Sequence, residues 1–246
     1  MSARLLDVGD GAVTIEFGST VSPALVARVA AFERAVDAAR AGGALAGVVE
    51  TVPTFRSLTV LYNPLLTSRA ELDPVLHRLL GQGQPAHLTT PRLWRLPVCY
   101  GGRHGADLEA VASSCGLSPD DVVRLHAGAG FTVYMLGFMP GFAFMGGLPE
   151  ALSVPRRQEP RLRVPAGSVA ITGGLTAIYP WESPGGWQLL GRCPVPLFNA
   201  AAPSPVLLAP GDRVDFEPVS AARHAELDAA LRAGKLLAEH FLQPPA

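Results

Sequence analysis

The stretch GFMPGFAFMGGLPE, residues 137–150, contains six Gly or Pro residues and six Phe, Met or Leu residues among its fourteen. That much Gly and Pro is incompatible with a helix, and a surface linker would not need so many large apolar side chains. From residue 131 to residue 217, Pro and Gly separate short apolar runs, which predicts a β-barrel or sandwich with many turns. We expect residues 137–150 to turn the chain at a barrel rim. Phe138, Phe142 and Phe144 would pack inward there or line a cleft, and packing at a corner of the core fits the pattern at least as well as ligand contact.

Before this region, the first 80 residues have the pattern of a compact α+β unit in the order strand, strand, helix, strand, strand, helix. Alternating apolar positions predict strands over 11–17, 45–52 and 56–62. Helix starts are indicated by Ser22 before Pro23 and by a capping box of Ser68 and Glu71. An apolar stripe follows each start: Leu25, Val29, Phe32 and Val36 after the first, and Leu72, Val75, Leu76 and Leu79 after the second.

A short polar segment that ends at Pro85 is the predicted boundary between two domains, residues 1–84 and 85–246. Beyond it the pattern predicts a strand near residues 93–98, two helices, the turn-rich β region and a closing helix over 220–242. The predicted fold class is therefore α+β, with a small N-terminal α+β domain followed by a β-barrel or sandwich domain.

Composition excludes several kinds of chemistry. Apolar residues make up 48 % of the 246 residues, and the net charge of −1 gives no general attraction to nucleic acid or to an anionic membrane. The basic residues are 19 Arg and one Lys. A phosphate-binding loop needs Gly-Lys-Ser/Thr, and Lys235 is followed by Leu236. Anion recognition must therefore come from Arg side chains and backbone N–H groups.

Other features point to a cytoplasmic protein without metal or membrane. The three cysteines, Cys99, Cys115 and Cys193, are far apart and odd in number, which indicates reduced thiols. Acidic residues near the N-terminus and the lack of an apolar run of roughly 18 residues argue against a signal peptide and a membrane span. No histidine pair has metal-ligand spacing. His126 is expected either to complement a helix C-terminus as a charge or to act as a general acid or base.

The segment PRRQEPRLRVPAGSVAI, residues 155–171, places four guanidinium groups within eight residues: Arg156, Arg157, Arg161 and Arg163. Such a group can clamp a carboxylate or a phosphate, and Pro155, Pro160 and Pro165 stiffen the segment and pre-order it. The alternative is a solvated edge strand that charge keeps soluble, which is the commoner meaning of a charge run.

The segment YPWESPGGWQLLGRCP, residues 179–194, contains a turn with two glycines, Gly185 and Gly186. Glycine allows backbone N–H groups to approach a ligand, so the turn could form a small anion nest. A plain hairpin turn with Trp187 in the core is as compatible with the pattern. Tyr179, Trp187 and Arg192 could line one pocket.

These segments, in this order and spacing, resemble the family of 5-oxoprolinase B subunits, which is also named allophanate hydrolase subunit 1 and includes the KipI inhibitor of a sporulation kinase. LGFMPGFAFMGGLP, PRRQEPRLRVPAGSVAI and YPWESPGGWQLLGR carry the resemblance, with ETVPTFRSLTVLYNP at 50–64 and LPVCYGGRHGADLEAVA at 96–112. The resemblance covers nearly the whole chain. It implies a small N-terminal α+β domain followed by a cyclophilin-like β-barrel domain.

The resemblance also implies a function. The chain would be one component of an ATP-dependent 5-oxoprolinase that opens 5-oxoproline to L-glutamate, in complex with the C-type and A-type subunits of that enzyme. ATP with Mg²⁺ would be used by the assembled complex, and no tightly bound cofactor is expected. The alternatives are a component of an allophanate- or urea-type amide hydrolase and a KipI-like inhibitor of a sensor histidine kinase. Against amide hydrolysis by this chain stands the single lysine, because amidases use a Ser-Ser-Lys triad.

Carried over by motif, the substrate- or nucleotide-binding residues are Arg156, Arg161, Ser168, Tyr179, Ser183, Gly185, Gly186, Trp187 and Arg192. No catalytic base is assigned. Phe131, Phe144, Met145 and Cys193 depart from the residues common in the family at their positions, so a hydroxyl from those positions cannot be essential here. We expect the arginine segment and the Ser183–Trp187 turn to face one shared cleft.

Overall fold

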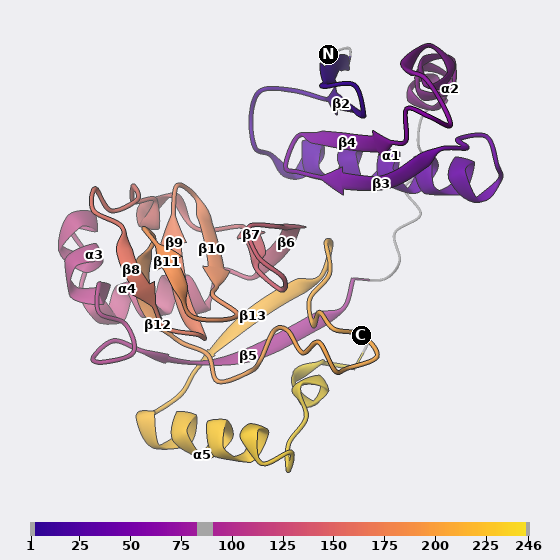
Figure 1. The fold of residues 1–246 in the computed structure, drawn as a ribbon. Helices are drawn as coiled ribbons and strands as arrows, with labels where there is room; N and C mark the ends of the chain where they lie inside the picture. Colours follow the sequence, from indigo (N-terminus) through magenta and orange to yellow (C-terminus); the bar gives the residue numbers. More distant parts are fainter. Residues whose placement is uncertain (1–2, 83–90, 245–246) are drawn as a thin grey trace. The chain divides into compact units, whose positions relative to one another are not determined.

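The computed structural model describes residues 3–82 and 91–244, and the chain forms two compact units, Met1–Thr89 and Thr90–Ala246 (Figure 1). The domain boundary expected from the sequence, between residues 84 and 85, lies outside the described residues and stays a prediction. Within the described ranges, no helix combines the length and the apolar character that crossing a bilayer requires.

The first unit is an antiparallel sheet with two helices. Its elements are β1 (Arg4–Val8), β2 (Ala12–Glu16), α1 (Pro23–Ala41), β3 (Val48–Pro53), β4 (Ser57–Tyr62) and α2 (Arg69–Gly81). The strand order across the sheet is β1-β2-β4-β3, and each neighbouring pair is antiparallel. Helix α1 packs across β3 and β4 (Figure 1). This is the order of elements predicted from the sequence.

The predicted helix starts are both present. The Ser22 side chain accepts a hydrogen bond from the Leu25 N–H at 3.3 Å, and the α1 stripe of Val29, Phe32 and Val36 is buried. At α2, Ser68 and Glu71 form the reciprocal capping box, with the Ser68 N–H donating to Glu71 Oε2 at 2.8 Å. The buried α2 residues are Leu72, Leu76 and Leu79. Local capping and one apolar face thus explain each helix.

In the second unit, seven strands of the described residues close into a barrel. They are β5 (Leu93–Tyr100), β6 (Phe131–Leu136), β7 (Ala143–Gly146), β9 (Ser168–Thr172), β10 (Leu175–Ile178), β12 (Gln188–Arg192) and β13 (Arg213–Pro218). Their order around the barrel is β10-β7-β6-β13-β5-β12-β9. The β13–β5 pair is parallel, and the other pairs are antiparallel. The α+β class and the predicted β-barrel are confirmed.

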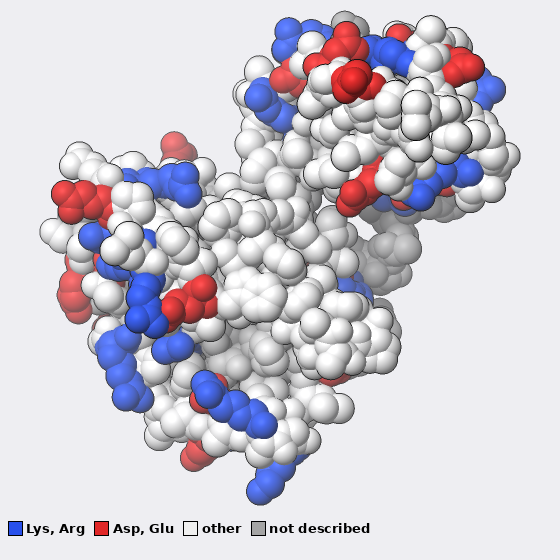
Figure 2. All heavy atoms as spheres, viewed as in Figure 1, with Lys and Arg blue, Asp and Glu red and all other residues white. Residues whose placement is uncertain are grey.

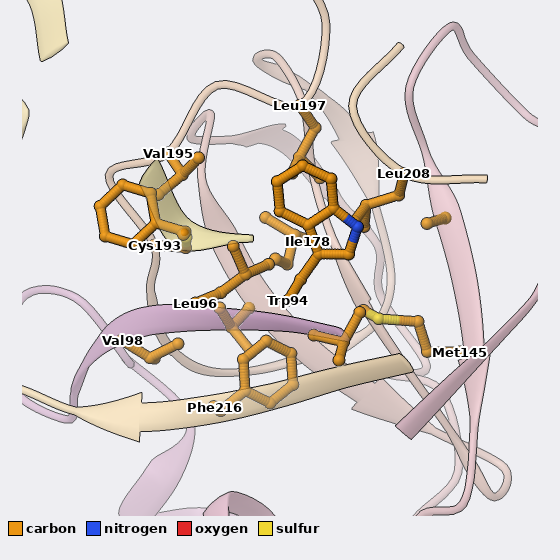
Figure 3. Packing of buried hydrophobic residues seen from close by; sticks show 14 of the residues in the cluster. Trp94, Leu96, Val98, Met145, Ile178, Cys193, Val195, Leu197, Leu208 and Phe216 are labelled. Atoms are coloured by element: carbon orange, nitrogen blue, oxygen red, sulfur yellow. The ribbon is translucent and has the colours of Figure 1, made fainter. Parts of the chain in front are cut away.

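Apolar side chains fill the barrel interior. Figure 3 shows Trp94, Leu96, Ile178 and Leu208 within one packed cluster, and each is at most 1 % exposed. The indole N–H of Trp94 donates to Asp212 Oδ2 at 3.1 Å. Because that buried polar group is satisfied, the tryptophan can occupy the core without an unpaired donor.

Helices cover parts of the barrel. Helix α3 (Leu108–Cys115) packs against β12, and α4 (Pro119–Ala127) packs against β13 and the 3₁₀ helix η1 (Glu150–Leu152). The chain ends with α5 (Ala221–Arg232) and a 3₁₀ helix, η2 (Ala238–Phe241). The prediction of one continuous closing helix over 220–242 is wrong after Arg232. Gly234 has φ +66°, a left-handed conformation that ends a helix.

The segment 137–150 turns the chain between β6 and β7. Phe142 packs inward and is 1 % exposed, and its ring lies 4.8 Å from that of Phe144, which is partly buried. The expectation that Phe138 also packs inward is wrong. Phe138 is 67 % exposed and has φ +68°, so the bend itself turns this side chain away from the core.

Candidate functional site

Two short strands outside the barrel bring the sequence motifs together. Strand β8 (Arg161–Val164) carries the arginine segment and β11 (Ser183–Gly185) carries the glycine turn. They pair antiparallel, with Ser183 opposite Val164 and Gly185 opposite Arg161. The Arg157 N–H also donates to the Gly186 carbonyl at 2.7 Å. Figure 2 shows basic side chains gathered over the part of the second unit where β8 and β12 lie in Figure 1.

Asp107, directly before α3, holds two of the arginines. Its Oδ1 accepts from Arg161 Nη2 at 2.6 Å and from Arg157 Nη1 at 3.2 Å. Its Oδ2 accepts from the Leu189 N–H at 2.7 Å, and the Asp107 side chain is only 5 % exposed. Charge-assisted hydrogen bonds of this kind fix guanidinium orientation. Asp107 therefore positions Arg157 and Arg161 rather than capping α3, to which it makes no side-chain cap bond.

Tyr179 is the second fixed group. Its side chain is 1 % exposed, and burial raises the pKa of its phenol. The Arg156 guanidinium, a hydrogen bond with the Trp187 backbone and the Arg161 guanidinium partly offset that rise in pKa. A Cβ at position 185 would lie 2.9 Å from Tyr179 Cε1 and closer still to its hydroxyl oxygen, so only glycine fits against this tyrosine. The phenol thus stays neutral between two cations.

We refer to Asp107, Arg156, Arg157, Arg161 and Tyr179 as the arginine cluster. It has spare donors for a ligand. Arg161 Nη1 is buried and has no hydrogen-bond partner among the described residues. Arg156 lies on the surface, within electrostatic reach of the Tyr179 hydroxyl. Planar guanidinium groups with unused N–H donors suit a carboxylate or a phosphate.

The nine predicted residues do not form one constellation. Arg156, Arg161, Tyr179, Gly185, Gly186 and Trp187 lie in or against the arginine cluster. Ser183 lies on β11 beside it, with its hydroxyl donating to the Pro184 carbonyl at 3.3 Å. Ser168 is buried on β9, opposite Arg192 on β12.

Arg192 opens onto a different surface. Its Nε donates to the Ala166 carbonyl at 2.8 Å, and the residue lines a pocket of about 620 Å³. Tyr179 also borders this pocket, whereas Trp187 does not line it. The arrangement predicted for Tyr179, Trp187 and Arg192 is therefore divided between two surfaces.

His126 has neither of its two expected roles. It is fully buried, and burial lowers the pKa of its imidazole to about 3, so it is neutral and carries no charge for the helix end. Its Nδ1 lies 2.8 Å from the Tyr100 hydroxyl and its Nε2 2.9 Å from Thr176 Oγ1. The Thr176 hydroxyl in turn bonds the Ala170 carbonyl at 3.1 Å. His126 is a hydrogen-bonded core residue that no substrate can reach.

The site fits oxyanions better than metal ions. The described part of the chain contains no group of three or more His, Cys, Asp or Glu residues placed to hold a metal. The one carboxylate in the arginine cluster, Asp107, is already occupied by two arginines and the Leu189 N–H. The phosphates of a nucleotide or the carboxylate of a substrate fit these donors, while an Mg²⁺ ion has no cluster to bind in the described residues.

Comparison with known proteins first gives the class of domain to which this chain belongs. The carboxyltransferase domain, subdomain C and D, matches residues 3–208. The urea amidolyase of Kluyveromyces lactis shares the fold with a TM-score of 0.78 over 98 % of this chain and 16 % of that protein, at 19 % identity.

Relatives of nearly equal length give the family. The 5-oxoprolinase B subunit of Escherichia coli O157:H7 is 43 % identical over 88 % of this chain and 96 % of its own length. Its namesake in Bacillus subtilis is 36 % identical over 88 % of this chain and 93 % of its own length. This chain therefore belongs to the family of 5-oxoprolinase B subunits, as its motifs indicated.

Proposed function

We propose that this chain is the B subunit of an ATP-dependent 5-oxoprolinase that hydrolyses the lactam of 5-oxoproline to L-glutamate. It would act in the cytoplasm with the C-type and A-type subunits of the same enzyme. The arginine cluster carries the proposal, because Arg161 Nη1, which has no partner in the described part of the chain, and the surface Arg156 lie beside a neutral phenol. Relatives with this name match over almost their full lengths.

The reaction needs the groups that the cluster supplies. Ring opening breaks the lactam C–N bond, water provides the new carboxylate oxygen, and the nitrogen leaves as an amine. An amide resists this attack, and ATP, when bound by the complex, would supply a phosphoryl group that makes the carbonyl a better electrophile and then leaves as inorganic phosphate. The arginines would hold the substrate carboxylate or a phosphate, and the Tyr179 hydroxyl would donate a hydrogen bond to an anionic oxygen.

The test uses the assembled complex. The chain is co-expressed with its C-type and A-type partners, and ADP release that depends on 5-oxoproline is measured. Arg156→Ala and Arg161→Ala are expected to lower turnover by at least about tenfold, the usual effect of losing a hydrogen bond to a charged group. The matched control is Arg163→Ala, because Arg163 lies on the same strand as Arg161 but is 78 % exposed and paired with Glu182.

The outcomes separate the two parts of the proposal. If the wild-type complex assembles and releases no ADP with 5-oxoproline, the proposed reaction is wrong. If the wild type is active and the Arg156 and Arg161 variants match the Arg163 variant, the reaction stands and the arginine cluster is not its binding site.

A further inference from the structure

The pocket that Arg192 borders is a second site, separate from the arginine cluster in most of its residues. It lies between the loop after β5, the end of β12 and helix α5. The loop contributes Arg103 and His104, and the helix contributes His224 and Asp228. Its volume of about 620 Å³ is in the usual range for small-ligand sites. We refer to it as the histidine pocket.

Two buried imidazoles face each other in this pocket. The rings of His104 and His224 have centroids 4.7 Å apart, and the residues are 9 % and 7 % exposed. His104 Nδ1 and His224 Nε2 are buried and have no hydrogen-bond partner in the described ranges 3–82 and 91–244. Leaving a buried polar group unpaired is costly, so two such atoms at one pocket favour a ligand whose polar groups pair with them.

The hydrogen bond from Arg103 decides which kind of ligand fits. Arg103 Nε donates to His104 Nε2 at 3.3 Å, so this nitrogen is an acceptor and does not carry the proton of the neutral ring. The proton must then lie on Nδ1, the atom without a partner among the described residues. The pocket therefore presents a buried N–H donor, which a ligand with an acceptor oxygen would satisfy and a metal ion would not.

The surrounding charge favours an anion. Burial lowers the pKa of His104, and Arg103 and Arg192 lower it further. Burial and His104 lower the pKa of His224, with Arg192 and Arg103 in the same direction, while Asp228 opposes them. The acidic group does not cancel this field, because Asp228 Oδ2 is paired with Arg232 Nε at 2.9 Å. Arg192 uses Nε for the Ala166 carbonyl, and no hydrogen bond from its terminal amino groups is found among the described residues, so they can bind a ligand.

We propose that the histidine pocket binds a small oxyanion, a phosphate or a carboxylate, through Arg103, Arg192 and the Nδ1–H of His104. This goes beyond the proposed reaction, which needs only the arginine cluster. Binding is coupled to protons. An anion offsets the field of Arg103 and Arg192, so it favours the charged form of His224, and affinity rises as pH falls toward the titration range of this residue.

The experiment uses the full chain alone and inorganic phosphate as the probe. The carbon-bound imidazole protons are followed by NMR during a phosphate titration at constant ionic strength, and then during a pH titration with and without phosphate. Saturable shifts of the His104 and His224 signals are expected, with a higher pKa for His224 in phosphate. A parallel titration with acetate separates the two ligand sources, because tighter binding of either anion assigns the natural ligand to that class.

Two variants test whether the anion binds through Arg103. Arg103→Ala should weaken binding by at least about tenfold. The matched control is Arg223→Ala, on α5 next to His224 but paired with Glu226 and not lining the pocket. If Arg103→Ala does not fold, the NMR shifts of His104 and His224 in the wild-type chain still show whether the pocket binds an anion. The proposal is overturned if neither anion shifts these signals saturably, if both variants bind equally, or if zinc and not an anion gives the saturable response.

Discussion

At the scale of single residues, Gly185 and Gly186 make a matched pair. A side chain at 185 would collide with Tyr179, while a Cβ at 186 would come no closer than 3.7 Å to its nearest neighbour, Pro160. Gly185→Ala should therefore lower the free energy of unfolding by about 1–3 kcal/mol and reduce turnover of the complex, because Tyr179 must move. Gly186→Ala should stay within about 0.5 kcal/mol of the wild type. Urea unfolding of both variants checks this, and equal stabilities would contradict the close packing of Tyr179 on Gly185.

His126 gives the molecule a pH dependence of known sign. Its folded pKa of about 3 lies below its unfolded value, so the unfolded chain binds the extra proton first as pH falls. The contribution of His126 to the free energy of unfolding is fully present above about pH 6.5. It is lost as pH falls toward 3, with a slope of about 1.4 kcal/mol per pH unit.

The measurement is the free energy of unfolding from pH 7 to pH 4, compared with the His126→Gln variant. The variant should be less stable at pH 7 but lose less stability per pH unit. Parallel curves for the two proteins would show that the imidazole is already accessible to protons in the folded state. His104 and His224 also have lowered pKa values and make stability fall with pH in the same way. Both residues are present in the wild type and the variant, so their effect cancels in the difference between the two curves.

The sequence motifs alone could predict some residues of the arginine cluster. The motifs selected Arg161, Tyr179 and Gly185, which the fold does bring together. Asp107 was not foreseen, because an Asp before a helix normally signals a cap, and nothing local shows that its carboxylate turns toward residues 50 and 54 positions away. Pairing between residues so far apart in the sequence depends on the barrel topology, which cannot be derived from a single sequence.

At the scale of elements, α4 depends on its N-cap. Ser118 Oγ accepts from the Asp121 N–H at 3.1 Å and donates to Asp121 Oδ2 at 2.7 Å. Ser118→Ala should lower the free energy of unfolding of the second unit by about 1 kcal/mol. Ser114→Ala is the control, because that hydroxyl only donates to the Ala110 carbonyl within α3. Thermal unfolding of the two variants distinguishes them, and an equal loss would assign the effect to helix propensity instead of capping.

Most elements with local signals were predicted well, but the end of the closing helix was not. The capping box at Ser68 and the stripe of α1 are read within one or two turns of chain, and both are present. The closing helix failed at Gly234, where a left-handed residue outweighs the apolar positions that follow it. Those positions serve the barrel core instead, since Phe241 belongs to the same buried cluster as Trp94.

At the scale of the whole molecule, we predict that an exposed apolar side chain on β8 belongs to a partner surface. Leu162 lies on β8 between two arginines and is 86 % exposed. In the proposed complex it would contact the C-type partner beside the arginine cluster. Leu162→Asp should leave the stability of the isolated chain unchanged and weaken assembly by about tenfold, whereas Leu237→Asp, 66 % exposed in the same unit, should assemble normally. Co-purification with the partner checks this, and full assembly of the Leu162 variant would remove β8 from the interface.

The parallel β5–β13 pair has a consequence for how the protein is made. It aligns residues 93–98 with residues 213–218, and the chain end returns to the same strand, where the Gln243 N–H donates to the Leu93 carbonyl at 2.8 Å. During translation, β5 leaves the ribosome more than a hundred residues before β13, one of its two neighbours, exists. Until then the hydrogen-bonding groups on the β13 side of β5 are unpaired and able to associate with other nascent chains. We therefore expect barrel closure to be a late step that loop entropy slows, and we expect the growing polypeptide to aggregate most readily just before β13 emerges.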